Sequence, residues 1–335
     1  MPAAKRIAKK IFFGTVLLLI IFCLWFLYEF FCIPHKSPSE ILFEISKGQT
    51  AKEVGQALKK RGIIRLRWPF LFGYKFFYSS HTLKAGEYLF RLPLSTKDII
   101  EKLIEGRILL HTYTVPEGLT RKETAAHFET LGLCLEKDFL AASEDTSLIT
   151  HLDPEADNLE GYLYPETYHF PKYTQPGMLV SAMIRQFQEI FTGEWKNKAN
   201  DMNMSVREIV ILASLIEKET SLTHEKKLVS SVFHNRLKRG IKLDCDPTII
   251  YVLKENDRFT GRLRYKDLKM DDPYNTYIYG GLPPGPISNP GKESLEAALY
   301  PANTDYLYFV SRNDGSHKFS ATLKEHNKAV RKYQK

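Results

Sequence analysis

The sequence lacks the motifs of several large enzyme classes. It has no Gly-x-Ser-x-Gly motif, no Walker pattern and no GxGxxG turn opening a helix. A serine hydrolase of that type, a P-loop enzyme and a dinucleotide-dependent enzyme are therefore not indicated. HExxH is also absent, and His224 and His234 do not have the spacing of metal ligands on a helix. We expect neither a catalytic metal nor a cofactor.

Cysteine is scarce, and its placement excludes two further classes. The 335 residues include four cysteines, Cys23, Cys32, Cys134 and Cys245. Two lie in or beside an apolar N-terminal segment and two are far apart, so the pattern predicts neither a disulfide scaffold nor a zinc site. No internal repeat or low-complexity tract is present. Carboxylate chemistry is what remains for an enzyme.

The longest apolar run lies at the N-terminus. Ile11–Tyr28 is an 18-residue stretch without charge, about the shortest length that spans a bilayer. Four cations precede it: Lys5, Arg6, Lys9 and Lys10. Positive charge stays in the cytoplasm. We therefore expect a cytoplasmic tail (1–10), a single-pass anchor in the cell inner (cytoplasmic) membrane (11–33) and an extracytoplasmic remainder. A cleaved signal peptide is the alternative, but the run is long for one and no small-residue cleavage site follows.

The charge and aromatic patterns around the anchor indicate its surroundings. Trp25, Tyr28 and Phe30 suit the membrane interface on the outer side. The formal net charge is +8, and removing the four N-terminal cations leaves 8 − 4 = +4 for the rest. So mild an excess is weak evidence for nucleic-acid binding, and we predict that the chain does not bind nucleic acid. It is compatible with an anionic extracytoplasmic polymer.

Residues 38–110 have the pattern of a small α+β domain. Ile41–Ile45 alternates like a strand, and Thr50 with Glu53 forms a capping box for a helix that stops at Gly62. An aromatic helix is predicted over Trp68–Tyr78, followed by a strand and a helix capped at Ser95. The strand–Gly–Thr–helix opening resembles a LysM-type module, which binds N-acetylglucosamine-containing glycans. Glycan binding and a purely structural role both remain open.

The most distinctive stretch of the larger region 111–335 is Ile209–Thr220. Ser205 and Glu208 form a capping box before it, and the run is apolar on nearly every side, which predicts a buried helix. Glu217 continues the apolar stripe near the C-terminal end. Desolvation and the negative end of the helix dipole both raise a carboxyl pKa, as a general acid requires. The alternative is that Glu217 marks the point where the helix emerges into water.

Three other segments carry candidate site residues. Leu159–Tyr168 is aromatic and acidic, and its Glu166 and Tyr168 are candidates for holding sugar. Asp272–Tyr277 supplies the candidate hydrogen-bonding or stacking residues Asn275, Tyr274 and Tyr277. The Pro- and Gly-rich segment Gly280–Gly291 predicts a rigid loop beside them. Asp246 precedes Pro247, so we interpret Asp246 as a helix N-cap in preference to a catalytic group.

Six blocks occur in an order that resembles the YceG-like family. They are Leu159–Tyr168, Leu212–Thr220, Phe233–Leu237, Asp246–Thr248, Tyr274–Tyr277 and Gly281–Ile287. The resemblance covers about residues 38–335. Cys245 departs from it, because related sequences more often carry a small polar residue there. The expected architecture is α+β: a single transmembrane helix, a small LysM-like subdomain and a larger mixed α/β catalytic domain (111–335).

The resemblance implies a lytic transglycosylase that acts on peptidoglycan. Such an enzyme cleaves the β-1,4 bond between N-acetylmuramic acid and N-acetylglucosamine, leaves a 1,6-anhydro end and thereby ends strand elongation. It also implies that Glu217 is the catalytic acid and that peptidoglycan synthases are partners. Glu219 lies about 200° further round the helix, so we assign it to the structural end of the helix.

Two other functions remain as alternatives. The first is a glycan hydrolase, which needs a second carboxylate; Glu160, Glu166, Glu219 and Asp246 are candidates. The second is a non-catalytic cell-wall scaffold that binds glycan through the LysM-like unit.

Overall fold

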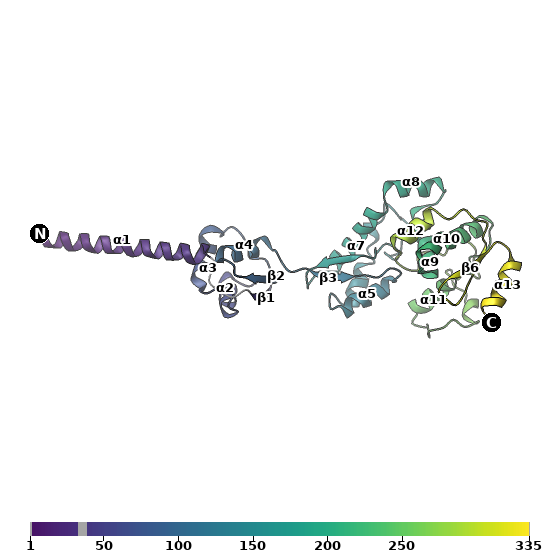
Figure 1. Ribbon diagram of the computed structural model, residues 1–335, viewed down its shortest axis with the longest axis horizontal. Coiled ribbons are helices and arrows are strands. Elements are labelled where there is room, and N and C mark those ends of the chain that lie inside the picture. The colour runs from purple at the N-terminus through teal and green to yellow at the C-terminus, as the bar shows by residue number, and fades with distance from the viewer. Residues whose placement is uncertain (1, 33–38, 335) are drawn as a thin grey trace. The chain divides into compact units, whose positions relative to one another are not determined.

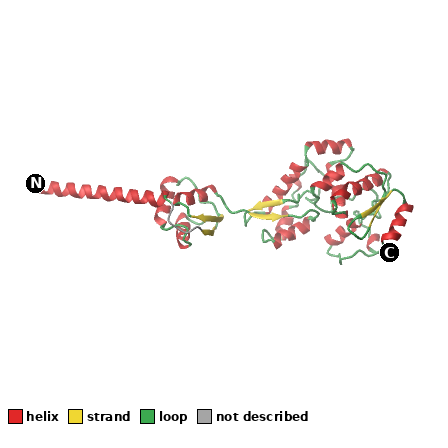
Figure 2. Ribbon diagram, viewed as in Figure 1, coloured by secondary structure: helices red, strands yellow, loops and turns green. Residues whose placement is uncertain are grey.

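The computed structural model describes residues 2–32 and 39–334, so Ile33, the last residue of the expected anchor, lies outside the described part. The chain divides into two compact units (Figures 1 and 2). The first comprises Met1–His111 and His169–Tyr173, and the second comprises Thr112–Tyr168 and Thr174–Lys335. Helices and short strands occur in both, as the α+β prediction requires.

The first unit begins with helix α1 (Pro2–Phe31). Its segment Lys9–Phe31 is long and apolar enough to cross a membrane, and most of its side chains are exposed. Glu29 and Phe30 are different, since only 8% and 1% of them are exposed, and Phe30 belongs to the hydrophobic core of this unit. Phe30 is therefore covered by protein, and its expected place at the membrane interface stays a prediction. Gly73 makes room for its ring, because a Cβ there would overlap Phe30.

The rest of the first unit follows the predicted order of elements. Strand β1 (Ser39–Ile45) pairs antiparallel with β2 (Gly86–Leu92). Helices α2 (Ala51–Lys60), α3 (Arg67–Phe77) and α4 (Thr96–Glu105) complete the unit. The capping boxes predicted at the starts of α2 and α4 are both present. The likeness of this unit to a LysM module and its binding of glycan both stay predictions.

The second unit is mainly helical, with two short two-stranded sheets, β3–β4 and β5–β6, in the described residues. The first sheet contains β3 (His111–Thr114) and β4 (Thr167–Phe170), and the boundary between the units falls within these strands. The second contains β5 (Tyr308–Ser311) and β6 (His317–Ser320). The helices are α5 (Arg121–Thr130), α6 (Glu136–Ala142), α7 (Pro176–Ile190), α8 (Gly193–Asp201), α9 (Val206–Glu219), α10 (Thr223–Lys238), α11 (Asp246–Glu255), α12 (Lys292–Leu299) and α13 (Leu323–Tyr333), with 3-10 turns at Thr146–Leu148 and Asp267–Lys269.

Helix α9 is the central element of the second unit. It contacts α8, α10, α11 and α12, and every residue from Ile209 to Ile216 is buried. The capping box of Ser205 and Glu208 starts it, as predicted. Burying a large apolar side chain stabilises a fold by about 1.5–3 kcal/mol. The apolar run therefore fixes the position of the charged last turn, which carries Glu217 and Glu219.

Candidate active site

Glu217 lies in an ion pair. Both of its carboxylate oxygens accept hydrogen bonds from Lys226 Nζ, at 3.1 and 3.2 Å, and Oε2 also accepts one from the backbone N–H of Gly291 at 3.0 Å. Only 7% of the Glu217 side chain and 4% of the Lys226 side chain are exposed. A cation and an N–H donor stabilise a carboxylate in its ionised form. Glu217 is therefore one partner of a buried ion pair, which the sequence did not indicate.

A second carboxylate lies on the other side of Lys226. Glu117 Oε2 is 3.7 Å from Lys226 Nζ, and the Glu117 carboxyl group lies where a side chain on Gly291 would project. Burial raises the pKa of Glu117, and the neighbouring Glu217 charge raises it further. Lys218 crosses to the same loop and donates to the Gly118 carbonyl. The result is a compact charged cluster, which we call the Lys226 cluster: Glu117, Glu217 and Lys226.

Glu219 lies in a different environment. Cys245 Sγ donates a hydrogen bond to Glu219 Oε1 at 3.0 Å, and the side chain remains partly exposed. Burial raises the pKa of Glu219 to about 7, the hydrogen bond from Cys245 lowers it, and the nearby charge of Asp246 raises it. A carboxyl group with this pKa is substantially protonated near neutrality, and Glu219, like Glu217, is a partly exposed residue. Protonation and partial exposure are both properties of a general acid.

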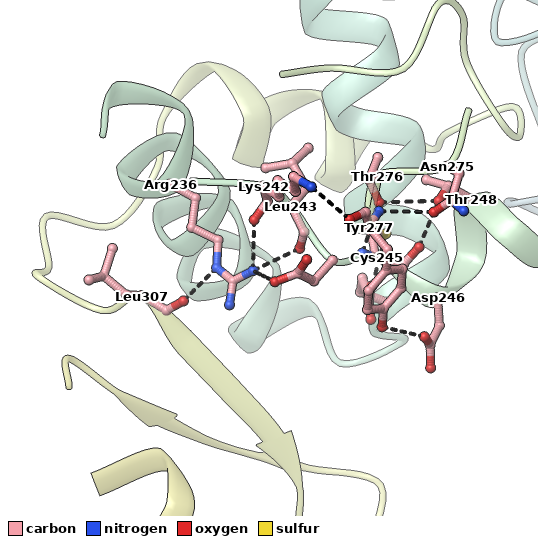
Figure 3. A network of polar contacts seen from close by, with 12 residues as sticks. Arg236, Lys242, Leu243, Cys245, Asp246, Thr248, Asn275, Thr276, Tyr277 and Leu307 are labelled. Atoms are coloured by element: carbon pink, nitrogen blue, oxygen red, sulfur yellow. Dashed lines mark hydrogen bonds and ion pairs between the residues drawn. The ribbon is translucent and has the colours of Figure 1, made fainter. Parts of the chain in front are cut away.

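Polar groups near Glu219 come from two other segments. The Tyr277 hydroxyl donates to Asp246 Oδ1 at 2.6 Å (Figure 3). Helix α11 begins at Asp246, with Cys245 as its N-cap residue, so Asp246 is not the N-cap that we predicted. The Thr276 hydroxyl accepts from the Cys245 N–H instead. The structure therefore brings Tyr277 and Asp246 together, and the charge of Asp246 acts on Glu219.

Asn275 lies inside the loop and not on its surface. Its side chain donates to the Leu268 and Met270 carbonyls at 3.1 and 2.6 Å and accepts from the Tyr277 N–H at 3.0 Å. The residue is fully buried. All of these partners are backbone groups, so the contacts indicate that Asn275 shapes the loop that presents Tyr277. Its expected role in holding sugar stays a prediction.

Replacing Asn275 with Ala should therefore lower stability. Buried backbone groups that lose a partner cost about 1–3 kcal/mol each, so we expect the free energy of unfolding to fall by roughly 2 kcal/mol. Thermal or denaturant unfolding of the full chain measures this. The matched control is Asn200→Ala in the exposed surface of α8, which should change stability little. Equal stabilities for the two variants, with a loss of cleavage for Asn275→Ala alone, would favour the sugar-binding role.

The remaining predicted residues are spread over two other regions. Tyr274 packs against Tyr251, with ring centroids 5.3 Å apart, and lines a small hollow with Glu160 and Arg207. Tyr168 is buried and donates to the Tyr164 carbonyl. Glu166 is exposed and accepts from the Thr167 N–H. The structure places these three residues outside the direct contacts of Glu219.

Glu160, a candidate for a second catalytic carboxylate, is held by the backbone. Its two oxygens accept from the Arg121 N–H at 3.0 and 2.9 Å, and Asn289 Nδ2 donates to Oε1 at 3.3 Å. Only 5% of it is exposed, and burial raises its pKa to about 8. These contacts indicate a structural role.

Sequence reasoning missed three groups that organise the site: Lys226, Glu117 and Asn289. Lys226 stands in a helix rich in lysine, and nothing in its spacing distinguishes it from its neighbour Lys227, which is half exposed. Asn289 lies in Gly280–Gly291, and the predicted rigidity of that Pro- and Gly-rich loop was a signal that it carries functional residues. A hollow of about 1000 Å³ lies near the opposite end of α9, lined by Met204, Arg207 and Pro284, and includes neither Glu217 nor Glu219.

Comparison with known proteins supports the resemblance. The profile of the YceG-like family matches residues 43–332. A Bacillus subtilis protein named endolytic murein transglycosylase is 35% identical over 90% of this chain and 87% of its own length. A Streptococcus pneumoniae protein of the same name is 30% identical over 89% of this chain, which spans 59% of that longer protein. The crystal structure of a putative YceG-like protein from Listeria monocytogenes, 34% identical, matches 86% of this chain and 98% of its own with a TM-score of 0.60.

Proposed function

Because this chain belongs to the YceG-like family, we propose that it is an endolytic lytic transglycosylase that cleaves peptidoglycan strands. Residues 111–335 are its catalytic domain and 38–110 its LysM-like domain. The observation that carries the proposal is the last turn of α9. There a partly exposed carboxyl group with a pKa of about 7 lies beside hydroxyl and carboxylate groups, in a chain similar over nearly its full length to a murein transglycosylase.

We assign the proton transfer to Glu219. In its protonated form it donates to the oxygen that bridges N-acetylmuramic acid and N-acetylglucosamine. As a carboxylate it then accepts the proton of the muramyl C6 hydroxyl while that oxygen bonds to C1. The bond from C1 to the bridging oxygen breaks, a 1,6-anhydro ring forms, and water is not consumed. One carboxyl group with a pKa near the working pH suits both steps.

Glu217 keeps its place as the alternative proton donor. Its carboxylate oxygens accept hydrogen bonds from Lys226 Nζ and from the Gly291 N–H. We infer that the Lys226 cluster fixes the loops around the end of α9. The catalytic role that the resemblance implies for Glu217 stays a prediction, and Glu219 is the acid that we propose.

The anchor supports a role at the membrane. The apolar part of α1 is consistent with a single span of the inner membrane, with residues 1–10 in the cytoplasm and the catalytic domain outside it. Such an anchor keeps the site near the membrane face where new strands emerge, so that cleavage there ends elongation. Peptidoglycan synthases are the partners that this position favours.

Digestion of purified peptidoglycan tests the function. The full chain in detergent or nanodiscs is incubated with peptidoglycan, and mass spectrometry identifies the new ends. We expect 1,6-anhydromuramyl ends. Reducing ends would favour the glycan hydrolase, and intact strands would favour the non-catalytic scaffold.

The pKa of Glu219 predicts the pH dependence of cleavage. Because the acid form is active, the rate should fall as pH rises through about 7. The hydrogen bond from Cys245 stabilises the Glu219 carboxylate, so Cys245→Ala should raise that pKa and move the basic limb of the pH–rate profile to higher pH. Cys245→Ser keeps a donor and should move it less. If the unchanged chain and both Cys245 variants had the same basic limb, the group that titrates there would not be Glu219.

A further inference from the structure

Helix α3 has an exposed aromatic face that no part of the described fold covers. Trp68, Phe72 and Phe76 follow one another at helical spacing, and 53%, 38% and 71% of each residue is exposed. Their rings contact in sequence, with centroid distances of 5.9 Å and 6.1 Å. Phe70 and Gly73, on the opposite face, are buried. We call the three exposed residues the aromatic stripe. Soluble proteins rarely leave so large an apolar patch without a partner.

The position of α3 identifies what can cover the stripe. Helix α3 contacts the end of α1, and the Phe77 ring lies 5.5 Å from the ring of Phe30 in the last turn of α1. Figure 1 shows α3 at the end of the first unit where α1 enters. The stripe therefore lies next to the point where a membrane-spanning α1 leaves the bilayer.

The sequence that surrounds the stripe carries charged side chains of one sign. Residues 54–86 contain seven lysine or arginine residues and no aspartate or glutamate. Arg67 lies over the Trp68 ring at 5.1 Å, and Lys75 is exposed on the same helix. Helices that lie in the membrane interface combine Trp and Phe on one face with Lys and Arg beside them. Cations near the surface are attracted to anionic lipid headgroups.

We propose that α3 lies in the outer headgroup region of the membrane that α1 spans, with the aromatic stripe inserted among the lipids and the flanking cations on phosphate groups. This inference rests on the membrane anchoring proposed above. It makes the first unit a membrane-attached platform with two contacts, α1 and α3. With both contacts the unit is held at the bilayer surface, whereas α1 alone leaves it free to tilt.

The chain has three tryptophans, one in each part that the test must distinguish: Trp25 in α1, Trp68 in α3 and Trp195 in the second unit. Full-length variants that keep one of them, with Phe at the other two positions, are placed in phosphatidylcholine–phosphatidylglycerol vesicles with or without lipid brominated on its acyl chains. Bromine quenches only tryptophans that reach the acyl region. Acrylamide in the aqueous phase gives the complementary measurement.

We expect Trp25 and Trp68 to be quenched by the brominated lipid several-fold more than Trp195, and Trp68 to be shielded from acrylamide. Phe72→Ser with Phe76→Ser should sharply reduce the quenching of Trp68 and leave that of Trp25 unchanged. The control, Leu131→Ser with Leu135→Ser at exposed positions of the second unit, should change neither.

Each other result overturns the proposal in a recognisable way. Quenching of Trp25 without quenching of Trp68 would support the membrane anchor and contradict the docking of α3. If neither tryptophan were quenched, the membrane anchor would be contradicted as well. A Trp68 that is shielded from acrylamide but not quenched by lipid would mean that protein covers the stripe. Unchanged Trp68 quenching after the two Phe substitutions would mean that the stripe does not hold α3 at the membrane.

Discussion

Replacing Glu219 with Gln should reduce peptidoglycan cleavage by roughly 10³-fold or more, because positioned acid–base catalysis contributes about 10²–10⁴-fold and this group acts in both steps. Gln has nearly the same shape and still accepts the hydrogen bond from Cys245, but it has no acidic proton. The variant should therefore fold normally. Initial rates of anhydromuramyl product formation, together with a thermal unfolding curve, measure both expectations.

Glu217→Gln is the matched control on the same turn of the same helix. It removes the negative charge beside buried Lys226, and hydrogen bonds to a charged group contribute about 1.5–3 kcal/mol. We expect a stability loss of roughly 2 kcal/mol and a much smaller loss of cleavage per folded molecule. Full activity in Glu219→Gln with none in Glu217→Gln would restore Glu217 as the catalytic acid.

Replacing Asn289 with Ala should destabilise the second unit more than the substitutions at Asn275 and Glu217. Its Oδ1 accepts from the Gly161 and Leu163 N–H groups at 2.9 and 3.0 Å, and its Nδ2 donates to the Leu119 carbonyl at 2.9 Å. The residue is 1% exposed. Several buried groups would lose their partners at about 1–3 kcal/mol each, so the free energy of unfolding should fall by about 3 kcal/mol or more.

For a domain of this size that loss lowers Tm by roughly 6–12 °C. Calorimetry of the full chain measures the shift. Asn256→Ala is the control, because the side chain of that exposed residue makes one hydrogen bond, to the Val252 carbonyl. A Tm change for Asn289→Ala no larger than that of the control would show that the loop carrying Asn289 is held by other contacts.

Local sequence signals predicted the starts of the helices well. The capping boxes at Thr50, Ser95 and Ser205 are all present. A capping box involves residues three apart, so its geometry is complete within the local chain. The N-cap of α11 was misplaced by one residue because Cys245, which makes no side-chain cap, occupies that position.

The sequence by itself determined that a buried apolar helix ends in two glutamates, that an apolar span precedes the folded units and that the chain resembles the YceG-like family. Only the tertiary structure decided how the two glutamates differ. Helical spacing places Glu217 on the apolar stripe and Glu219 away from it, but it does not reveal which side chains arrive from elsewhere. Lys226 comes from the next helix and neutralises Glu217, whereas Cys245 and Asp246 come from a later segment and meet Glu219. A carboxyl pKa depends on charges and burial within a few ångströms, and those neighbours are assembled by folding.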